Sequence, residues 1–461
     1  MFRNTRHIHL VAIGGVGMSG IAEVLLNLGF TVSGSDLRRT AVTDRLAALG
    51  ATVHVGHAAG QVAGADVVVR SSAVTEANAE VREARRRRIP VIRRAEMLAE
   101  LMRLKEGVAI AGSHGKTTTT SMTAAVMAAG RLDPTVIVGG KVLAVGSGAI
   151  LGGGPYLLAE ADESDGSFLH LTPTIAVVTN IDHEHVDHYH DMDALRAAFA
   201  EFLARVPFYG TAILCIDDPE VRELAARVDR RMVTYGLTRE ADLYADPETL
   251  VEGPAGQQVD VHAGGEHLGR LSLPQAGRHN LRNALAALAV GRELGVEFAA
   301  AAAGLAAFGG VGRRCEVHGE HDGVLVMDDY GHHPTEISAT MDVARAQGRP
   351  VAVLFQPHRF SRTRHFAREF ADALSGADAV ALLPVYAAGE EDPGDAGSDV
   401  IADLLGRLRP EAPTLLPGPD GLPAWLDAAV PPGHLLLTLG AGDIGRMVTS
   451  LCDHLDMRAA R

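Results

Sequence analysis

The sequence predicts an α/β protein of three domains, each built around a mainly parallel β-sheet. Short apolar runs alternate along the chain with longer stretches of helical periodicity, which is the pattern of repeated β-α units. A chain of 461 residues is too long for a single core, and its 47% of hydrophobic residues can fill several. Polar and glycine-rich segments follow the apolar runs, where the carboxyl ends of parallel strands would gather them at one edge. The expected domains are residues 1–104, 105–311 and 312–461.

Composition excludes several classes of protein. A formal net charge of −15 argues against a nucleic-acid coat, which needs a basic face. No apolar run approaches the roughly eighteen residues of a membrane span, and the first residues lack the layout of a signal peptide. The cysteines at 215, 315 and 452 are too far apart to suggest a disulfide framework or a zinc site. We therefore expect a cytoplasmic protein without nucleic-acid or membrane partners.

The first domain opens with a glycine-rich turn. An apolar run at 9–13 precedes the G-x-G-x-x-G of residues 15–20, and an apolar helix is expected at 21–26. This arrangement indicates a phosphate group held at a helix N-terminus. A second strand ends at Asp36, whose carboxylate could accept hydrogen bonds from a ribose or a base. The motif alone does not separate a nicotinamide cofactor from another diphosphate.

The second domain opens with a phosphate loop. The apolar run 108–111 leads into Gly112-Ser113-His114-Gly115-Lys116-Thr117-Thr118, and a helix is expected at 119–129. Backbone N–H groups of such a loop point at an anion, while Lys116 would reach the β- and γ-phosphates and the Thr117 hydroxyl would bind Mg²⁺. The alternative is a glycine-rich turn before a buried helix, which leaves a lysine at the helix start unexplained. The loop predicts ATP binding.

Two polar edges follow in the same domain. The apolar run 156–159 leads into Glu160-Ala161-Asp162-Glu163-Ser164-Asp165, and the run 175–178 leads toward the segment 182–185, Asp-His-Glu-His. Crowded carboxylates repel one another unless a cation lies among them. The alternative is a pair of solvated loops. We expect the two edges to converge on the phosphate loop as a metal site.

The third domain repeats the alternation, with apolar runs at 324–328, 351–355, 379–383 and 435–439. Histidines and arginines follow the first two runs, at 332–333 and at 358–362, and single histidines of this kind are often only structural groups. Before this domain, residues 277–283 begin an alanine-rich helix. Their asparagines would contact adenine or phosphate, or would simply cap the helix.

Eight motifs in this order resemble the Mur ligases of peptidoglycan synthesis. They are G-G-V-G-M-S-G at 14–20, G-S-H-G-K-T-T-T at 112–119, A-E-A-D-E-S-D at 159–165, T-N-I-D-x-x-H at 179–185, G-R-H-N-x-x-N at 277–283, D-D-Y-G-H-H-P-T-E at 328–336, F-Q-P-H-R-F-S-R-T at 355–363 and G-A-G-D-I at 440–444. The resemblance extends from residue 9 to about residue 444 and is closest to the branch that adds L-alanine. It implies a Rossmann-like UDP-binding domain, a P-loop-type ATPase central domain and a Rossmann-like C-terminal domain.

The activity that the resemblance implies is ATP-dependent amide-bond formation between L-alanine and the carboxylate of UDP-N-acetylmuramic acid. The carboxylate would first become an acyl phosphate, and the amine of L-alanine would then attack it. ATP and two Mg²⁺ ions, with Mn²⁺ as an alternative metal, would support the reaction. The implied partners are these small molecules, and the implied state is a monomer or a weak homodimer.

The resemblance also implies roles for individual residues. Those implied in catalysis are Lys116, Glu160, His185, His332 and Arg359. Metal binding is implied for Thr117, Glu160 and His185. Nucleotide binding is implied for Gly112, Ser113, His114, Gly115, Lys116, Thr117, Thr118, Asn280, Asn283, Arg314 and Asp329. Binding of the sugar nucleotide and the amino acid is implied for Gly15, Val16, Gly17, Met18, Ser19, Asp36, Ser71, His183, Tyr330, His332, His358, Arg359 and Arg362.

The sequence departs from the family pattern in three places. The helix at 193–199 has no lysine, so the carbamylated lysine that several related ligases use is absent, in agreement with the alanine-adding branch. Cys315 stands where an aromatic residue is expected, and residues 182–185 are a variant of the metal loop.

Three other functions compete with this interpretation. A recycling ligase of the same family would join a tripeptide to the same sugar nucleotide, but Tyr330-Gly331 favours the alanine enzyme. An oxidoreductase built on the first domain would leave the phosphate loop unexplained. A non-catalytic sugar-nucleotide-binding protein would not need Lys116, Thr117, Glu160 and His185.

Overall fold

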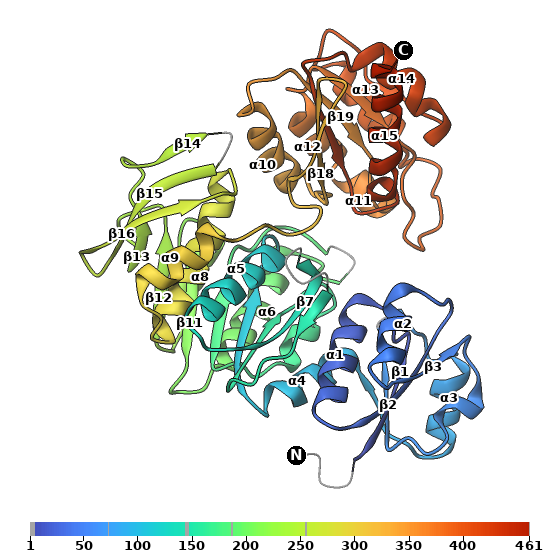
Figure 1. Cartoon of the computed structure of the whole chain (residues 1–461), viewed down its shortest axis with the longest axis vertical. Helices are drawn as coiled ribbons and strands as arrows, with labels where there is room; N and C mark the ends of the chain where they lie inside the picture. The colour runs from blue at the N-terminus through green and yellow to red at the C-terminus, as the bar shows by residue number, and fades with distance from the viewer. Residues whose placement is uncertain (1–4, 72, 143–146, 186–187, 254–255, 461) are drawn as a thin grey trace. The chain divides into compact units, whose positions relative to one another are not determined.

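The computed structural model describes residues 5–71, 73–142, 147–185, 188–253 and 256–460 (Figure 1). The chain forms two compact units, of which the first comprises Met1–Val251, Gln258–Pro274 and Asn280–Val311. The second comprises Glu252–Gln257, Gln275–His279 and Gly312–Arg461. Three separate sheets confirm the predicted α/β class with mainly parallel strands. The boundaries at residues 104 and 311 stay predictions.

The first sheet is wholly parallel and doubly wound, with the strand order β3-β2-β1-β4-β5. Its order reverses between β1 and β4, which is where ligands bind in open sheets of this kind. The strands are β1 (His7–Val11), β2 (Thr31–Asp36), β3 (Thr52–Val55), β4 (Val67–Arg70) and β5 (Val91–Arg93). The α-helices are α1 (Val16–Asn27), α2 (Ala41–Ala48), α3 (Ala79–Arg86) and α4 (Arg94–Met102), with a 3₁₀ turn at Ala59–Val62.

Helix α1 corrects the predicted start of the first helix. It begins at Val16 and therefore contains Gly17, whereas the sequence placed the helix only after the glycine-rich motif. A Cβ atom on Gly17 would lie 2.7 Å from the guanidinium of Arg94. The glycine lets the Arg94 side chain lie close against the helix, and it does not form a turn.

The central sheet has the order β14-β15-β13-β12-β11-β10-β6-β9-β7-β8, with β16 paired to β15. Its middle is parallel, whereas β8 on β7 and β15 on β13 are antiparallel. The strands are β6 (Glu106–Ala111), β7 (Thr135–Val142), β8 (Ser147–Ile150), β9 (Tyr156–Glu160), β10 (Ile175–Val178), β11 (Thr211–Cys215), β12 (Met232–Gly236), β13 (Leu243–Ala245), β14 (Val251–Gly253), β15 (Gly256–Ala263) and β16 (Glu266–Leu273). The α-helices are α5 (Lys116–Ala129), α6 (Met192–Ala204), α7 (Pro219–Ala225), α8 (Arg278–Glu293) and α9 (Phe298–Ala306), with a 3₁₀ turn at Ser167–His170.

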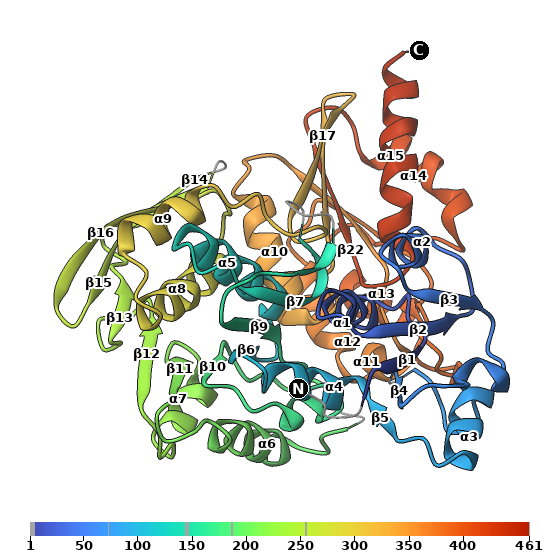
Figure 2. The same cartoon turned by 60° about the horizontal axis from the view of Figure 1, so that its bottom comes forward.

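Both faces of the central sheet are covered. Figure 2 shows α5, α8 and α9 on one side of its strands and α6 and α7 on the other. Strand β6 serves both cores, because Val108 and Ile110 pack in the cluster that contains Met122 of α5, and Ala109 packs in the cluster that contains Phe199 of α6. A strand buried on both faces must be apolar at every position, which explains the uninterrupted run before the phosphate loop.

The third sheet has the order β17-β18-β22-β19-β20-β21 and is parallel except for β17. Its strands are β17 (Glu316–His321), β18 (Val324–Asp329), β19 (Val351–Phe355), β20 (Ala379–Leu382), β21 (Thr414–Leu415) and β22 (Leu435–Leu439). The α-helices are α10 (Pro334–Arg345), α11 (Phe360–His365), α12 (Ala367–Leu374), α13 (Ser398–Gly406), α14 (Leu422–Ala429) and α15 (Ile444–Ala459), with a 3₁₀ turn at Pro419–Gly421.

Across the described ranges, no helix has both the length and the apolar composition needed to cross a membrane.

A buried polar network joins α3 to the first sheet. Glu80 is fully buried and accepts hydrogen bonds from His9 Nε2 at 2.9 Å and Ser35 Oγ at 2.7 Å. His57 Nδ1 lies 3.2 Å from its other oxygen. Burial by itself would raise the pKa of Glu80, but the hydrogen bonds from His9, Ser35 and His57 outweigh it and lower the pKa.

Replacing Glu80 by glutamine is therefore expected to weaken the first sheet in a pH-dependent way. Because the folded-state pKa lies below the ordinary value of 4.5, the contribution of Glu80 is present above that pH and declines as the pH falls through the folded-state pKa. We expect Glu80→Gln to lower the free energy of unfolding by about 2 kcal/mol at pH 7. The variant is also expected to lose less of its free energy of unfolding than wild type when the pH falls, because the contribution of the Glu80 carboxylate is already absent. Urea unfolding at pH 7 and pH 4, with hydrogen exchange of β1, measures both effects. Glu76→Gln, a change at an exposed carboxylate paired with Arg85, is the control, and equal pH dependence in the two variants would contradict the prediction.

Candidate active site

The phosphate loop connects the end of β6 at Ala111 to the start of α5 at Lys116. Helix α5 begins three residues earlier than predicted, so Lys116 and Thr117 lie in its first turn. Gly112 has φ +133° and Gly115 has φ +81°, which are values that favour glycine. Gly115 is the N-cap residue of α5 and, being a glycine, has no side chain that could accept a hydrogen bond from the helix. The first N–H groups of an α-helix have no partner within the helix itself, and they can bind an anion.

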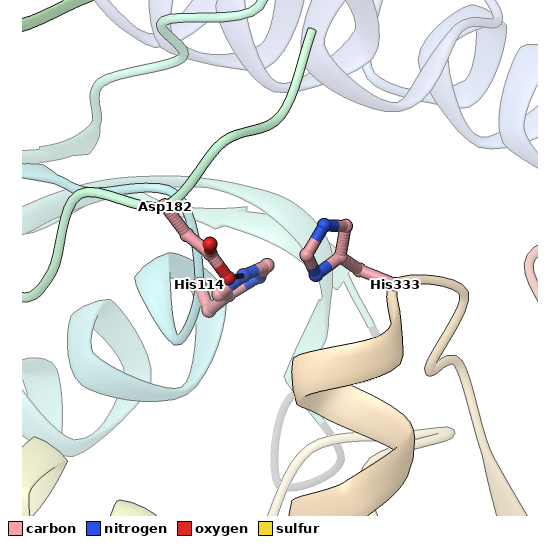
Figure 3. Close-up of side chains that lie close together, drawn as sticks. All are labelled: His114, Asp182 and His333. Atoms are coloured by element: carbon pink, nitrogen blue, oxygen red, sulfur yellow. Dashed lines mark hydrogen bonds and ion pairs between the residues drawn. The ribbon is translucent and has the colours of Figure 1, made fainter. Parts of the chain in front are cut away.

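The segment that follows β10 braces this loop. Asn180 Oδ1 accepts a hydrogen bond from the backbone N–H of His114 at 2.8 Å, and Thr179 Oγ1 donates to the carbonyl of His114 at 2.7 Å. His114 Nε2 also lies 2.8 Å from Asp182 Oδ2, and the two side chains approach one another in Figure 3. Thr179 and Asn180, which belong to the T-N-I-D motif, were not among the predicted site residues. The segment after β10 therefore lies directly against the phosphate loop.

Asp182 also forms hydrogen bonds with two of the predicted site residues, Ser113 and His183. Its backbone N–H donates to Ser113 Oγ at 2.9 Å, and its Oδ1 accepts from the backbone N–H of His183 at 2.8 Å. On the opposite side of the loop, Asn283 Oδ1 accepts from Thr119 Oγ1 at 3.1 Å. Asn280 and Asn283 are both buried on α8, and Asn283 packs against the start of α5.

Thr117 and Glu160 form a pair of oxygen donors at the C-terminal end of β9. Thr117 Oγ1 lies 3.1 Å from each carboxylate oxygen of Glu160. Hydroxyl and carboxylate oxygens are the ligands that Mg²⁺ prefers. The phosphate loop, the start of α5 and these two oxygen ligands therefore fit a magnesium-bound triphosphate.

Lys116 is directed at a carboxylate that sequence analysis mentioned but did not select. Its Nζ donates to Glu163 Oε1 at 2.8 Å, and His185 Nε2 lies 3.1 Å from the same oxygen. Burial by itself would lower the pKa of Lys116, but the negative charges of Glu163 and Asp162 outweigh burial and raise it, so the ammonium group stays charged. The carboxylate beside His185 is thus Glu163. The metal binding implied for Glu160 and His185 stays a prediction.

The first domain places Asp36 at the glycine-rich segment. Asp36 Oδ2 accepts a hydrogen bond from the backbone N–H of Gly14 at 2.9 Å. Met18 and Ser19 are buried in α1, Gly15 N–H donates to the carbonyl of Ala12 at 3.2 Å, and the side chain of Val16 lies outside what the structure describes.

A pocket of about 270 Å³ has Arg70, Ser71, Arg93 and Arg94 among its lining residues. Of these, sequence analysis selected Ser71 alone. Arg94 lies against Gly17, so this pocket places positive charge beside the first turn of α1. The lining also includes the carboxylate of Asp165, but three arginines outnumber it, so the pocket is suited to an anionic ligand.

In the second unit, aromatic and basic side chains gather around Tyr330. The guanidinium groups of Arg313 and Arg314 each lie 5.2 Å from the centre of the Tyr330 ring. Its carbonyl lies 3.1 Å from His332 Nδ1, and Glu336 Oε2 accepts from the backbone N–H of His332 at 3.1 Å. Of the predicted site residues, Arg314 and His332 thus lie beside Tyr330.

His358 lies in the same cluster, with its ring centre 5.9 Å from that of His332. Burial, acting together with the nearby His332, Arg362 and Arg359, lowers the pKa of His358 to about 4. His358 is therefore neutral at pH 7. Arg359 has φ +70°, which is a strained conformation for a residue with a side chain, and its Nη1 lies 3.8 Å from Glu390 Oε1.

Both carboxylate oxygens of Asp329 accept hydrogen bonds from its own domain. It is buried, and its two oxygens accept hydrogen bonds from the backbone N–H groups of Cys315 and Gly331, both at 2.7 Å. Burial raises the pKa of the Asp329 carboxyl group and also that of the Cys315 thiol. The observed role of Asp329 is to shape the turn after β18, and its contact with a nucleotide stays a prediction.

Three family models match consecutive parts of the chain. They are the Mur ligase family catalytic domain at residues 7–106, the Mur ligase middle domain at 110–291 and the Mur ligase glutamate ligase domain at 313–442. A UDP-N-acetylmuramate–L-alanine ligase of Anaeromyxobacter sp. (strain Fw109-5) is 56% identical over 438 residues, which cover 95% of each chain. The protein of the same name from Geobacter sulfurreducens is 50% identical over 447 residues, which cover 96% of each chain.

Solved structures agree with these relatives. The UDP-N-acetylmuramate–alanine ligase of Thermotoga maritima matches with a TM-score of 0.80 and 29% identity, covering 99% of this chain and 100% of that one. A murein peptide ligase from Psychrobacter arcticus matches with a TM-score of 0.72 and 24% identity, covering 98% of this chain and 99% of that one. The second match supports the fold alone.

Proposed function

This chain belongs to the Mur ligase family, and we propose that it is the ATP-dependent ligase that joins L-alanine to the carboxylate of UDP-N-acetylmuramic acid. The observation that carries the proposal is identity of 48–56% over nearly the whole length to relatives named for that reaction. The phosphate loop and the donor pair Thr117–Glu160 supply the chemistry that such a ligase needs.

The first unit contains two separate phosphate-binding sites, one for ATP and one for the sugar nucleotide. The backbone N–H groups at the start of α5 and the ammonium group of Lys116 bind the phosphates of ATP. Thr117 and Glu160 hold Mg²⁺, which when bound neutralises charge on the transferring phosphoryl group. The start of α1, with Arg94 beside Gly17, binds the diphosphate of the sugar nucleotide.

The second unit carries the groups suited to the amino acid. A guanidinium group binds a carboxylate through two parallel hydrogen bonds, and we assign this task to Arg359 or Arg362. Since neutral His358 accepts a proton only weakly at pH 7, we assign it to orienting ligands and not to deprotonating the amine.

Phosphate release with ATP, Mg²⁺ and UDP-N-acetylmuramic acid tests the proposal. We expect L-alanine to be the best acceptor, with kcat/KM about tenfold or more above glycine, because one methyl group contributes roughly 1–3 kcal/mol. L-serine and the tripeptide L-alanyl-D-glutamyl-diaminopimelate are the further acceptors, and EDTA is expected to stop the reaction. Activity with the tripeptide alone would assign the chain to the recycling reaction, and no activity with any acceptor would refute a ligase.

A further inference from the structure

Glu163 is a fully buried carboxylate that contacts Lys116 of the phosphate loop. It follows β9 by three residues, and its backbone carbonyl accepts a hydrogen bond from the buried Tyr189 hydroxyl at 2.7 Å. Its Oε2 atom has no hydrogen-bond partner among the described residues. A buried charged oxygen without a partner is costly, so a group that arrives with the substrates is expected to satisfy it.

The other oxygen, Oε1, is shared by two residues of the site. Lys116 Nζ lies 2.8 Å from it and His185 Nε2 lies 3.1 Å from it. At this contact His185 Nε2 carries the hydrogen, because a carboxylate only accepts. The same nitrogen cannot bind a metal while it donates to Glu163.

Lys116 uses all of its hydrogens in this arrangement. An ammonium group has three N–H donors, and Nζ donates to Glu163 Oε1, to the Gly112 carbonyl at 2.7 Å and to the Ser113 carbonyl at 3.0 Å. An incoming phosphate must therefore replace at least one of these partners. Glu163 is the charged one of the three, and its negative charge opposes a phosphate at this position.

We propose that Glu163 is a positioning residue that holds Lys116 and His185 over the phosphate loop before nucleotide binds, and then releases Lys116 to the phosphate. The proposal rests on the proposed function of the loop in binding ATP. Its consequence is that Glu163 weakens nucleotide binding while it speeds the reaction. A merely structural residue would favour both.

The first test is Glu163→Gln, with ADP affinity measured in EDTA so that neither metal nor turnover is involved. Glutamine keeps the size and an acceptor oxygen but removes the charge that competes for Lys116. We expect ADP to bind about three- to tenfold more tightly, while kcat for phosphate release falls by about tenfold or more. Glu106→Gln changes an exposed carboxylate at the start of the strand that leads into the loop, and is expected to leave both values unchanged.

The second variant is Glu163→Asp, which keeps the charge but is one methylene too short to hold both partners. We expect its ADP affinity to stay within about twofold of wild type and its kcat to fall. Unchanged or weaker ADP binding by Glu163→Gln, with an unchanged melting temperature, would overturn the proposal. If Glu163→Gln does not fold, wild-type kcat in Glu163→Asp would overturn it instead. A wild-type protein that binds no ADP would refute the proposed function of the loop.

Discussion

Replacing Lys116 by alanine is expected to reduce phosphate release by about a thousandfold or more. The ammonium group supplies the positive charge of the phosphate loop, and it acts where charge gathers on the transferring phosphoryl group. The affinity for UDP-N-acetylmuramic acid is expected to stay within about twofold of wild type, because the start of α1 and Arg94 of α4 lie in the segment that forms the first sheet, whereas Lys116 begins α5 in the segment of the central sheet. Single-turnover phosphate release and equilibrium binding of the sugar nucleotide measure the two effects.

Arg205→Ala is the matched control for Lys116→Ala. It also removes a cation from the first unit, but Arg205 is a surface residue that pairs with Glu201 one helical turn away. Both measurements are expected to match wild type in this control. If the sugar nucleotide is lost together with activity in Lys116→Ala, the division of labour between the first two sheets is wrong.

Replacing Gly112 by alanine is expected to lower the free energy of unfolding by about 3 kcal/mol or more and to prevent ADP binding. Its φ of +133° is strained for any other residue, and the new Cβ atom would lie 2.0 Å from Thr179 Oγ1 and 3.0 Å from the Thr179 backbone nitrogen. The loop can accept the methyl group only by moving away from the end of β10, which would remove the contacts that brace His114. Urea unfolding and ADP titration measure the two losses.

Gly29→Ala separates the cost of conformation from the cost of the clash. Gly29 has φ +84°, and nothing lies within 4 Å of the position that its Cβ atom would take. We expect this variant to lose about 1 kcal/mol and to bind ADP like wild type. A loss of similar size in both variants would show that the loop tolerates the approach of Thr179.

Much of the central site could be predicted from local sequence. The apolar run before Gly112 shows a strand buried on both faces, and the glycines with Lys116 and Thr117 show a phosphate loop at a helix start. These signals are local because they depend on side-chain period, on φ values that only glycine adopts readily, and on residues adjacent in the chain. The order of the motifs along the chain was sufficient to indicate the family, which the relatives confirm.

The partners of the loop were decided by tertiary structure. Glu160, Asp162, Glu163 and Asp165 are equivalent as a sequence pattern, and only the path of the chain after β9 brings Glu163 to Lys116 and leaves Glu160 beside Thr117. The same holds for Asn180 at His114, and for Arg94, which reaches Gly17 from α4.

The sequence by itself thus determined the α/β class, the phosphate loop and the types of residue available at the strand ends. The tertiary structure decided which of those residues meet. The physical reason is that parallel strands far apart in the chain place their carboxyl ends at one edge, where the length and turn of each following loop select a single carboxylate or amide for each contact.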